Sequence, residues 1–249
     1  MERTLRVGDA QVHLLGTIVG FVPDGARVQA ALDQGAIDCV GLGIPPEDLE
    51  GLRMLMEGKG IQEAGPVIEG AAAPAAGAPG LEGIHAIGEG HVPKGADDDA
   101  FQALDPTQQR FLELLGRYGE TRVPSPDLDV AYRWAQDNHM PVEALDLDDE
   151  AHASVYIRQN KFRHVIRSGR ILKRIMKEEF KDADDPHAFA VAWDDYLNSL
   201  PSLQGVEASR EEHMAQRIQE LAKVHDAIVA VVPAPRFAGV VARLESTPS

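Results

Sequence analysis

Hydrophobic and polar positions in the first forty-two residues follow the spacing first of strands, then of a helix, then of a strand again. Apolar runs at residues 5–7 and 12–15 flank the turn Gly8-Asp9, a pattern that predicts a hairpin, and the second run stays mostly apolar through Val19. Apolar residues then recur at helical spacing over 24–35, with Asp24 as the expected N-cap and Gly35 at the end. A further apolar run over 36–42 predicts a second buried strand, so the segment reads as a parallel βαβ unit.

Residues 58–99 have a different composition. Gly, Ala or Pro occupies 14 of the 17 positions in 64–80, and such residues cannot form a packed face of their own. We therefore expect 58–99 to be a Gly/Ala/Pro-rich excursion within a single α/β domain that spans residues 1–249.

Helical patterns dominate from residue 105 to a last apolar strand at 227–232. A long helix is expected over 149–180, after a short strand at 140–145 that Asp146 closes. Helix starts are signalled by Asp105-Pro106 with Gln108, by Ser125-Pro126, by Asp185-Pro186, and by Ser209 with Glu212 as a capping box. The sequence thus predicts a central mixed, mainly parallel sheet flanked by helices, with a helical insertion between the late strands.

The charge balance narrows the classes of function. Acidic residues number 40 and basic residues 24, which gives a net charge of −16 and argues against general nucleic-acid binding, because phosphates need a cationic face. No uncharged apolar run reaches the roughly 18 residues of a membrane span. The single cysteine, Cys39, cannot form an internal disulfide, and the first residues lack a secretory signal pattern, so we expect a cytoplasmic protein.

The predicted long helix carries the strongest local charge pattern. Residues 158–177 contain eight Lys or Arg side chains and no acid, and five of them form one stripe, namely Arg163, Arg167, Arg170, Arg174 and Lys177. Like charges at this spacing repel one another, so something should compensate them. Two interpretations stay open: acids from neighbouring helices surround the stripe, or the stripe binds an anionic ligand, a phosphate-bearing partner or an acidic protein surface.

Common catalytic motifs are absent from the sequence, including a P-loop, a Gly-x-Ser-x-Gly elbow and a His-Glu-x-x-His zinc motif. His85 and His91 lie near three consecutive aspartates at 97–99, a set that either binds a divalent ion or is a solvated acidic loop, and we favour the loop. A similar acidic group before His187 is explained more simply by helix capping through Asp185.

Several segments, in order, resemble the TraB/PrgY family. Residues 12–19, containing Gly16-Thr17-Ile18-Val19, and residues 37–42 are similar to its opening strands. Residues 131–146 are similar to its central helix, strand and Asp, 210–218 to its Arg-x-x-x-Met-Ala helix, and 231–240 to its closing strand and loop. The family includes the TIKI metalloproteases and is related in fold to erythromycin esterase and the haem-binding ChaN proteins, so the resemblance implies an α/β fold around a central sheet.

The resemblance also exposes three departures. Members of the family keep His in a Gly-Thr-x-His motif, Glu at the end of the second strand and His in a final Gly-x-Gly-His motif. Those places hold Val19, Gly43 and Arg236 here. Val and Gly side chains neither ligate a metal nor transfer a proton, and Arg is a poor ligand, so we expect no metal and no cofactor. The expected function is a non-catalytic binding or regulatory protein, a pseudoenzyme; the alternative is a metal-independent or divergent hydrolase or peptidase.

Three residues near the expected strand ends are candidates for whatever chemistry persists. Asp146, Arg210 and Arg236 are the candidate catalytic residues, and the two arginines, with the helical stripe, are the candidate anion-binding residues. We expect Arg210 in the first turn of its helix, sharing a cationic pocket with Arg236; the alternative is that each pairs with a local acid such as Glu207 or Glu211. The expected partner is a protein or a small anionic ligand, and the sequence leaves homo-oligomerisation open.

Overall fold

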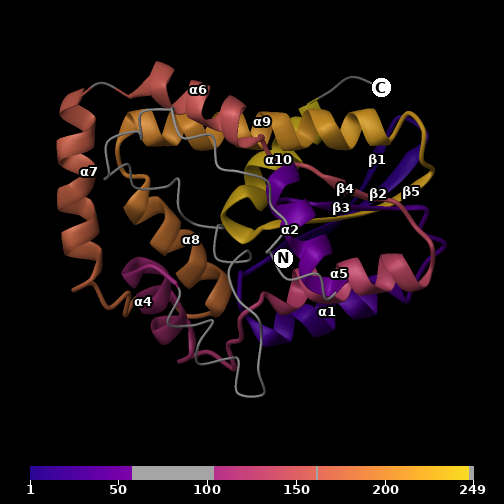
Figure 1. The fold of residues 1–249 in the computed structure, drawn as a ribbon, viewed down its shortest axis with the longest axis horizontal. Coiled ribbons are helices and arrows are strands. Elements are labelled where there is room, and N and C mark those ends of the chain that lie inside the picture. The colour runs from indigo at the N-terminus through magenta and orange to yellow at the C-terminus, as the bar shows by residue number, and fades with distance from the viewer. Residues whose placement is uncertain (58–103, 161, 247–249) are drawn as a thin grey trace.

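One five-stranded sheet organises the chain (Figure 1). The computed structural model describes residues 1–57, 104–160 and 162–246, with backbone alone at 162–166. The strand order is β1-β2-β5-β3-β4, in which β1 is antiparallel to β2 and the other neighbours are parallel. This confirms the predicted fold class. The strands are β1 (Glu2–Val7), β2 (Ala10–Thr17), β3 (Cys39–Leu42), β4 (Val142–Ala144) and β5 (Ala227–Pro233).

The first βαβ unit forms as expected, with one change at the start of its helix. Helix α1 (Val22–Leu32) has Phe21 at its N-cap, so the prediction of Asp24 as the N-cap is wrong. Asp24 is fully buried one turn further on and accepts a hydrogen bond of 2.7 Å from the Ile18 N–H. The Asp24 carboxylate thus accepts a backbone N–H of the turn before α1 and does not cap the free N–H groups of the helix. Helix α2 (Pro46–Met56) was not predicted.

The helical insertion begins at α4 (Pro106–Leu115) and α5 (Pro126–Asp137). The predicted capping box of Asp105 and Gln108 is present, with both reciprocal hydrogen bonds. The prediction of one long helix over 149–180 is wrong, because the segment forms two helices, α6 (Asp149–Gln159) and α7 (Phe162–Ile175). Asn160 adopts extended backbone angles, and its backbone and side-chain N–H groups both donate to the Tyr156 carbonyl, which ends α6.

The last three helices agree with their sequence signals to different extents. Helix α8 (Pro186–Leu197) starts at Asp185 as predicted, whereas α9 (Pro201–Leu221) starts well before the expected capping box. The Ser209 hydroxyl donates to the Gly205 carbonyl inside α9, so its predicted capping role is wrong and Arg210 lies in mid-helix. Helix α10 (Ala234–Ser246) directly continues β5, whereas the family resemblance implied a loop after this strand, up to residue 240.

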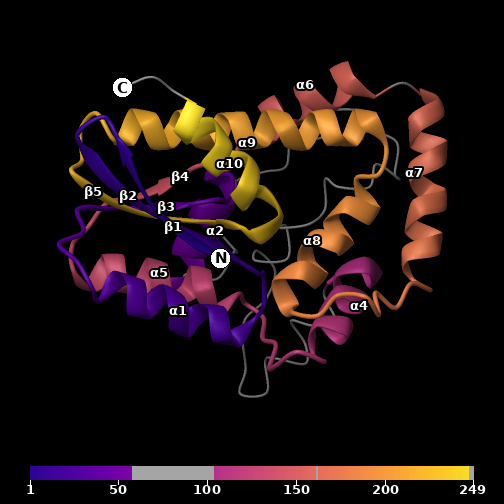
Figure 2. The ribbon, with the colours of Figure 1, turned by 180° about the vertical axis from the view of Figure 1, so that it is seen from behind.

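Helices cover both faces of the sheet (Figures 1 and 2). Helices α1 and α5 lie on one face, and α9 and α10 lie on the other. Alternation along β2 and β5 assigns their side chains to the two layers. Leu15 and Val231 pack with the α1 and α5 side, whereas Leu14 and Ala230 pack with the α9 and α10 side. None of the described helices is long and apolar enough to cross a membrane.

Candidate functional site

Open α/β sheets usually bind ligands beyond the carboxyl ends of their parallel strands. In this chain a third group of helices, α4, α7 and α8, lies beyond that edge (Figures 1 and 2). Ile18 and Phe21, which follow β2, and Ala234, which follows β5, belong to one hydrophobic cluster with side chains of α4 and α8. The insertion therefore packs an apolar layer directly against this edge of the sheet.

The three residues at positions where the family resemblance implies metal ligands differ in their exposure and surroundings. Val19 is about half exposed (51%) in the turn after β2, whereas Arg236 is buried in the first turn of α10. Gly43 continues β3 by donating to the Val231 carbonyl at 2.7 Å. This close approach brings the backbone of β5 so near that a Cβ at position 43 would lie 2.9 Å from Val232 Cα. No side chain, and thus no carboxylate, fits at that position without movement of the backbone.

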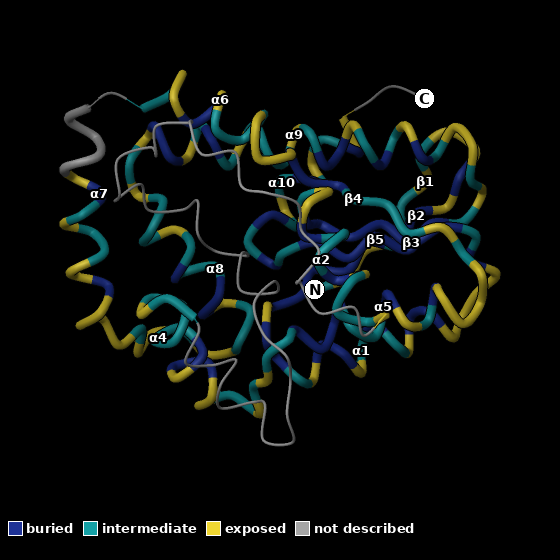
Figure 3. Tube along the Cα trace, in the orientation of Figure 1, coloured by how far each residue is buried: buried dark blue, intermediate teal, exposed yellow. Residues whose placement is uncertain are grey.

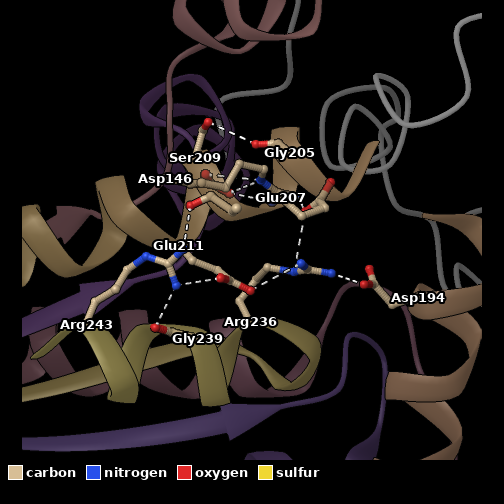
Figure 4. Close-up of polar contacts among 11 residues, drawn as sticks. Asp146, Asp194, Gly205, Glu207, Ser209, Glu211, Arg236, Gly239 and Arg243 are labelled. Atoms are coloured by element: carbon tan, nitrogen blue, oxygen red, sulfur yellow. Dashed lines mark hydrogen bonds and ion pairs between the residues drawn. The ribbon is translucent and has the colours of Figure 1, made fainter. Parts of the chain in front are cut away.

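Arg236 is held by carboxylates on two helices (Figure 4). It forms an ion pair with Asp194 of α8 through Nη2. On α9, its Nε lies 3.3 Å from Glu207 Oε2 and its Nη1 lies 3.5 Å from Glu211 Oε1. Its side chain is only 7% exposed, so all three contacts are made out of bulk water.

Arg210 shares one of these carboxylates. Its Nη1 lies 2.9 Å from Glu207 Oε2, and its Nε and Nη2 both donate to Asp146 at the end of β4. Glu211 in turn accepts from Arg243 of α10 at 2.7 Å. Three arginines and four carboxylates thus form a continuous set, which we call the arginine–carboxylate network: Arg210, Arg236, Arg243, Asp146, Asp194, Glu207 and Glu211.

The formal charge of the network is −1, so the region is not a cationic pocket. The structure does bring Arg210 and Arg236 together, as predicted. Their partners include Glu207 and Glu211, the acids named in the alternative interpretation, but the pairs are largely buried and do not lie in solvent. The expected helix N-terminus beside Arg210 is missing, because Arg210 lies in the middle of α9.

Burial and neighbouring charge oppose each other across the network. Burial lowers the pKa of Arg236 to about 10, so its guanidinium stays protonated at neutral pH. Burial also disfavours the charged form of Arg210, but Glu207 and Asp146 outweigh it and raise the Arg210 pKa. The pKa of Glu211 is raised, mainly by burial and against the attraction of Arg243. Glu211 therefore binds a proton more readily than an ordinary glutamate as the pH falls.

Asp146 has its hydrogen-bonding capacity occupied. It is buried, and its Oδ1 accepts from the Leu147 N–H at 2.8 Å while its Oδ2 accepts from Arg210 Nε at 3.1 Å. A general base needs a free lone pair that faces the substrate proton. The contacts of Asp146 are those of a structural anchor that joins β4 to α9.

Sequence reasoning missed Asp194 and Arg243. Neither residue belongs to a recognisable sequence pattern. Asp194 lies on α8, and Arg243 lies on α10, a helix that was not predicted. The seven-residue separation of Arg236 and Arg243 was the one available signal, since it places both on the same side of a helix.

A second buried polar group lies after β2 and was also missed. Asp127 accepts hydrogen bonds from the hydroxyls of Thr17, at 2.6 Å, and of Ser125, which itself accepts from the Gly20 N–H at 2.8 Å. Burial raises the pKa of Asp127, although the two hydroxyls favour its charged form. These contacts tie the turn after β2 to the start of α5.

The predicted cationic stripe lies apart from the network, on the outer helix α7 (Figure 1). Arg167, Arg170, Arg174 and Lys177 are exposed, and the side chain of Arg163 lies outside the described residues. Residues 58–103 are also outside them, including the whole of the 58–99 excursion with His85 and His91. Among the residues that are described, no group of three or more His, Cys, Asp or Glu side chains could hold a metal ion.

Comparisons with known proteins assign no family. No model of a protein family matches the chain, and no curated protein matches it either. The resemblance to the TraB/PrgY family stays a prediction from the sequence.

Proposed function

We propose that this chain is a non-catalytic binding or regulatory protein on a TraB/PrgY-like α/β fold. The proposal rests on one observation: the sheet edge where a catalytic site of such a fold would lie is covered, and the charged side chains beside it are paired with one another. Apolar side chains of α4 and α8 pack against it, and the arginines beside it are neutralised by carboxylates of the chain itself.

The residues at the family's metal positions do not fit a metal. Position 43 has no room for a ligating side chain, and Val19 offers no donor atom. At the third position stands the buried cation of Arg236, whose charge would repel a divalent ion. We accordingly derive no catalytic step through a metal.

A divergent hydrolase is less well supported. The candidate catalytic residues Asp146, Arg210 and Arg236 are all engaged in the arginine–carboxylate network, so none presents a free base or nucleophile. For the location we propose the cytoplasm, because Cys39, the single cysteine of the sequence, is free and buried in β3, where burial raises its pKa to about 12.

Metal content and hydrolysis test the proposal together. Protein expressed with added zinc, manganese or cobalt is measured by mass spectrometry for bound metal and assayed with activated esters and short peptides. We expect far less than one metal per chain and no hydrolysis above background.

Two variants make the assay specific. Asp146→Asn removes the charge of the candidate base, and Asp129→Asn is the control, because Asp129 is a partly buried aspartate on α5 that also pairs with an arginine. Hydrolysis that is lost in the first variant and kept in the second, in protein shown to be folded by circular dichroism, would overturn the proposal in favour of an enzyme. Stoichiometric metal in the parent protein would do the same.

A further inference from the structure

Five cations occupy the outward side of α7 and the turn after it. Arg167, Arg170, Lys173, Arg174 and Lys177 are all exposed, and we call them the α7 cationic face. At about 100° per residue they fall within roughly a third of the helix circumference. Among the described residues, none of the five has an ion pair or a side-chain hydrogen bond.

The opposite side of α7 is fixed against α8. Ile175 is fully buried in a cluster with Phe189 and Trp193. Ser168, which lies on the same side of α7 as Ile175, is buried as well. Figure 3 shows that buried and exposed positions alternate along the described part of α7. The packing therefore leaves the cations on the outward side of the helix as one row, which spans about 15 Å at 1.5 Å per residue.

We propose that the α7 cationic face is a docking surface for an acidic segment of a partner protein. Neighbouring like charges on the face repel one another, and carboxylates placed along a bound segment would remove that repulsion. Three of the five cations are arginines, whose planar guanidinium groups match carboxylates in a bidentate geometry.

Other anionic partners fit the molecule less well. An amphipathic helix that binds lipid inserts its apolar side into the membrane, but here that side is already packed on α8. An extended polyanion such as a nucleic acid would meet the rest of a chain whose net charge is −16. A short acidic segment needs the cationic face alone, so it avoids both obstacles.

This surface would supply the contact that the proposed binding role requires, and to that extent the inference rests on the proposed function. It lies on a different part of the molecule from the sheet edge. If the α7 cationic face fails to bind an acidic peptide, the metal and hydrolysis results for the sheet edge still stand. If the protein proves to be a hydrolase, the peptide titration still tests the α7 cationic face independently.

The test is a titration with a fluorescein-labelled helical peptide that carries glutamates at i, i+3 and i+4 spacing, read by anisotropy at 150 mM salt. The parent protein is compared with the charge-reversed variant Arg167→Glu, Arg170→Glu, Arg174→Glu. A matched control reverses three exposed arginines elsewhere: Arg3→Glu, Arg53→Glu, Arg133→Glu. Both variants change the net charge equally, so a difference in peptide binding between them does not come from net charge.

We expect saturable binding by the parent, a loss of at least about tenfold in affinity for the α7 variant and a loss of less than about threefold for the control. The neutral variant Arg167→Gln, Arg170→Gln, Arg174→Gln gives the same comparison if charge reversal unfolds α7. Absent binding by the parent, or equal loss in the two reversed variants, would overturn the proposal.

Three further measurements distinguish other occupants. Tighter binding of a single-stranded oligonucleotide than of the peptide would assign the face to nucleic acid and overturn the proposal. Tighter binding of phosphatidylserine vesicles would do so in favour of a membrane. A dimer seen in sedimentation that the charge-reversed variant dissolves would identify the occupant as a second copy of the chain, and would likewise overturn it.

Discussion

Arginines serve opposite purposes in two regions of this molecule. In the arginine–carboxylate network, three arginines meet four carboxylates at the edge of the sheet, mostly out of contact with water. On the α7 cationic face, five cations stand in solvent without an ion-pair partner among the described residues. The difference follows from solvation, because a buried guanidinium must find charged partners while an exposed one is hydrated.

The same comparison separates stability from binding. Removing one member of a buried ion pair leaves an uncompensated charge in a poorly solvated place, whereas an exposed charge changes the folding free energy little. The network therefore contributes to holding α8, α9 and α10 together, and the α7 cationic face is available for another molecule. Three experiments test whether the two regions really differ in this way.

The largest effect is expected for Arg236→Ala. It leaves Asp194, Glu207 and Glu211 without their shared cation, and we expect the free energy of unfolding to fall by about 3–5 kcal/mol in urea denaturation. Arg133→Ala is the control, since Arg133 is 64% exposed and has a single pair with Asp129. It should cost less than about 1 kcal/mol. Similar losses in the two variants would refute the role given to the network.

The sequence was sufficient for the elements whose signals are local. The hairpin around Gly8, the capping box of Asp105 and the start of α8 at Asp185 depend on residues a few positions apart, and all three formed as predicted. The mainly parallel character of the sheet follows from the apolar runs together with the rule that parallel strands need helical crossovers. The strand order, in which β5 lies between β2 and β3, does not follow from these local signals.

The candidate site was predictable only in part, because its contacts join distant segments. Arg210 and Arg236 were singled out correctly as neighbours, yet Asp194 and Arg243 depend on how α8 and α10 pack. The capping pattern at Ser209 was misleading, since Pro201 begins the same helix earlier and the pattern then falls inside it. A charge pattern gives the density of cations along a helix but cannot tell which of them are buried with a partner.

A smaller effect is expected from pH, and of the two regions compared it should appear in the network. The pKa of Glu211 is raised by burial, so the folded protein binds its proton more readily than the unfolded chain does. The contribution of Glu211 to stability is therefore present at low pH and is lost as the pH rises above the normal range of a glutamate, through its raised pKa.

Glu211→Gln removes this titration. The melting temperature of the variant minus that of the parent should be larger at pH 8 than at pH 5. Glu212→Gln, on the exposed side of the same helix, is the control and should show a constant difference. A difference between Glu211→Gln and the parent that does not change with pH would mean that Glu211 is ionised throughout, so that the pairs with Arg243 and Arg236 outweigh its burial.

The smallest effect on folding is expected from the α7 cationic face. Arg167→Gln, Arg170→Gln, Arg174→Gln removes like charges at i, i+3 and i+4 spacing, and Gln is nearly as good a helix former as Arg. We expect the free energy of unfolding to stay the same or to rise by about 0.5–1 kcal/mol, with the gain shrinking as added salt screens the repulsion in the parent. Urea denaturation at low and high salt measures both quantities. A loss above about 1 kcal/mol would mean that these arginines are paired with carboxylates of their own chain, as Arg236 is. The two regions would then be alike, and the α7 cationic face would not be free for a partner.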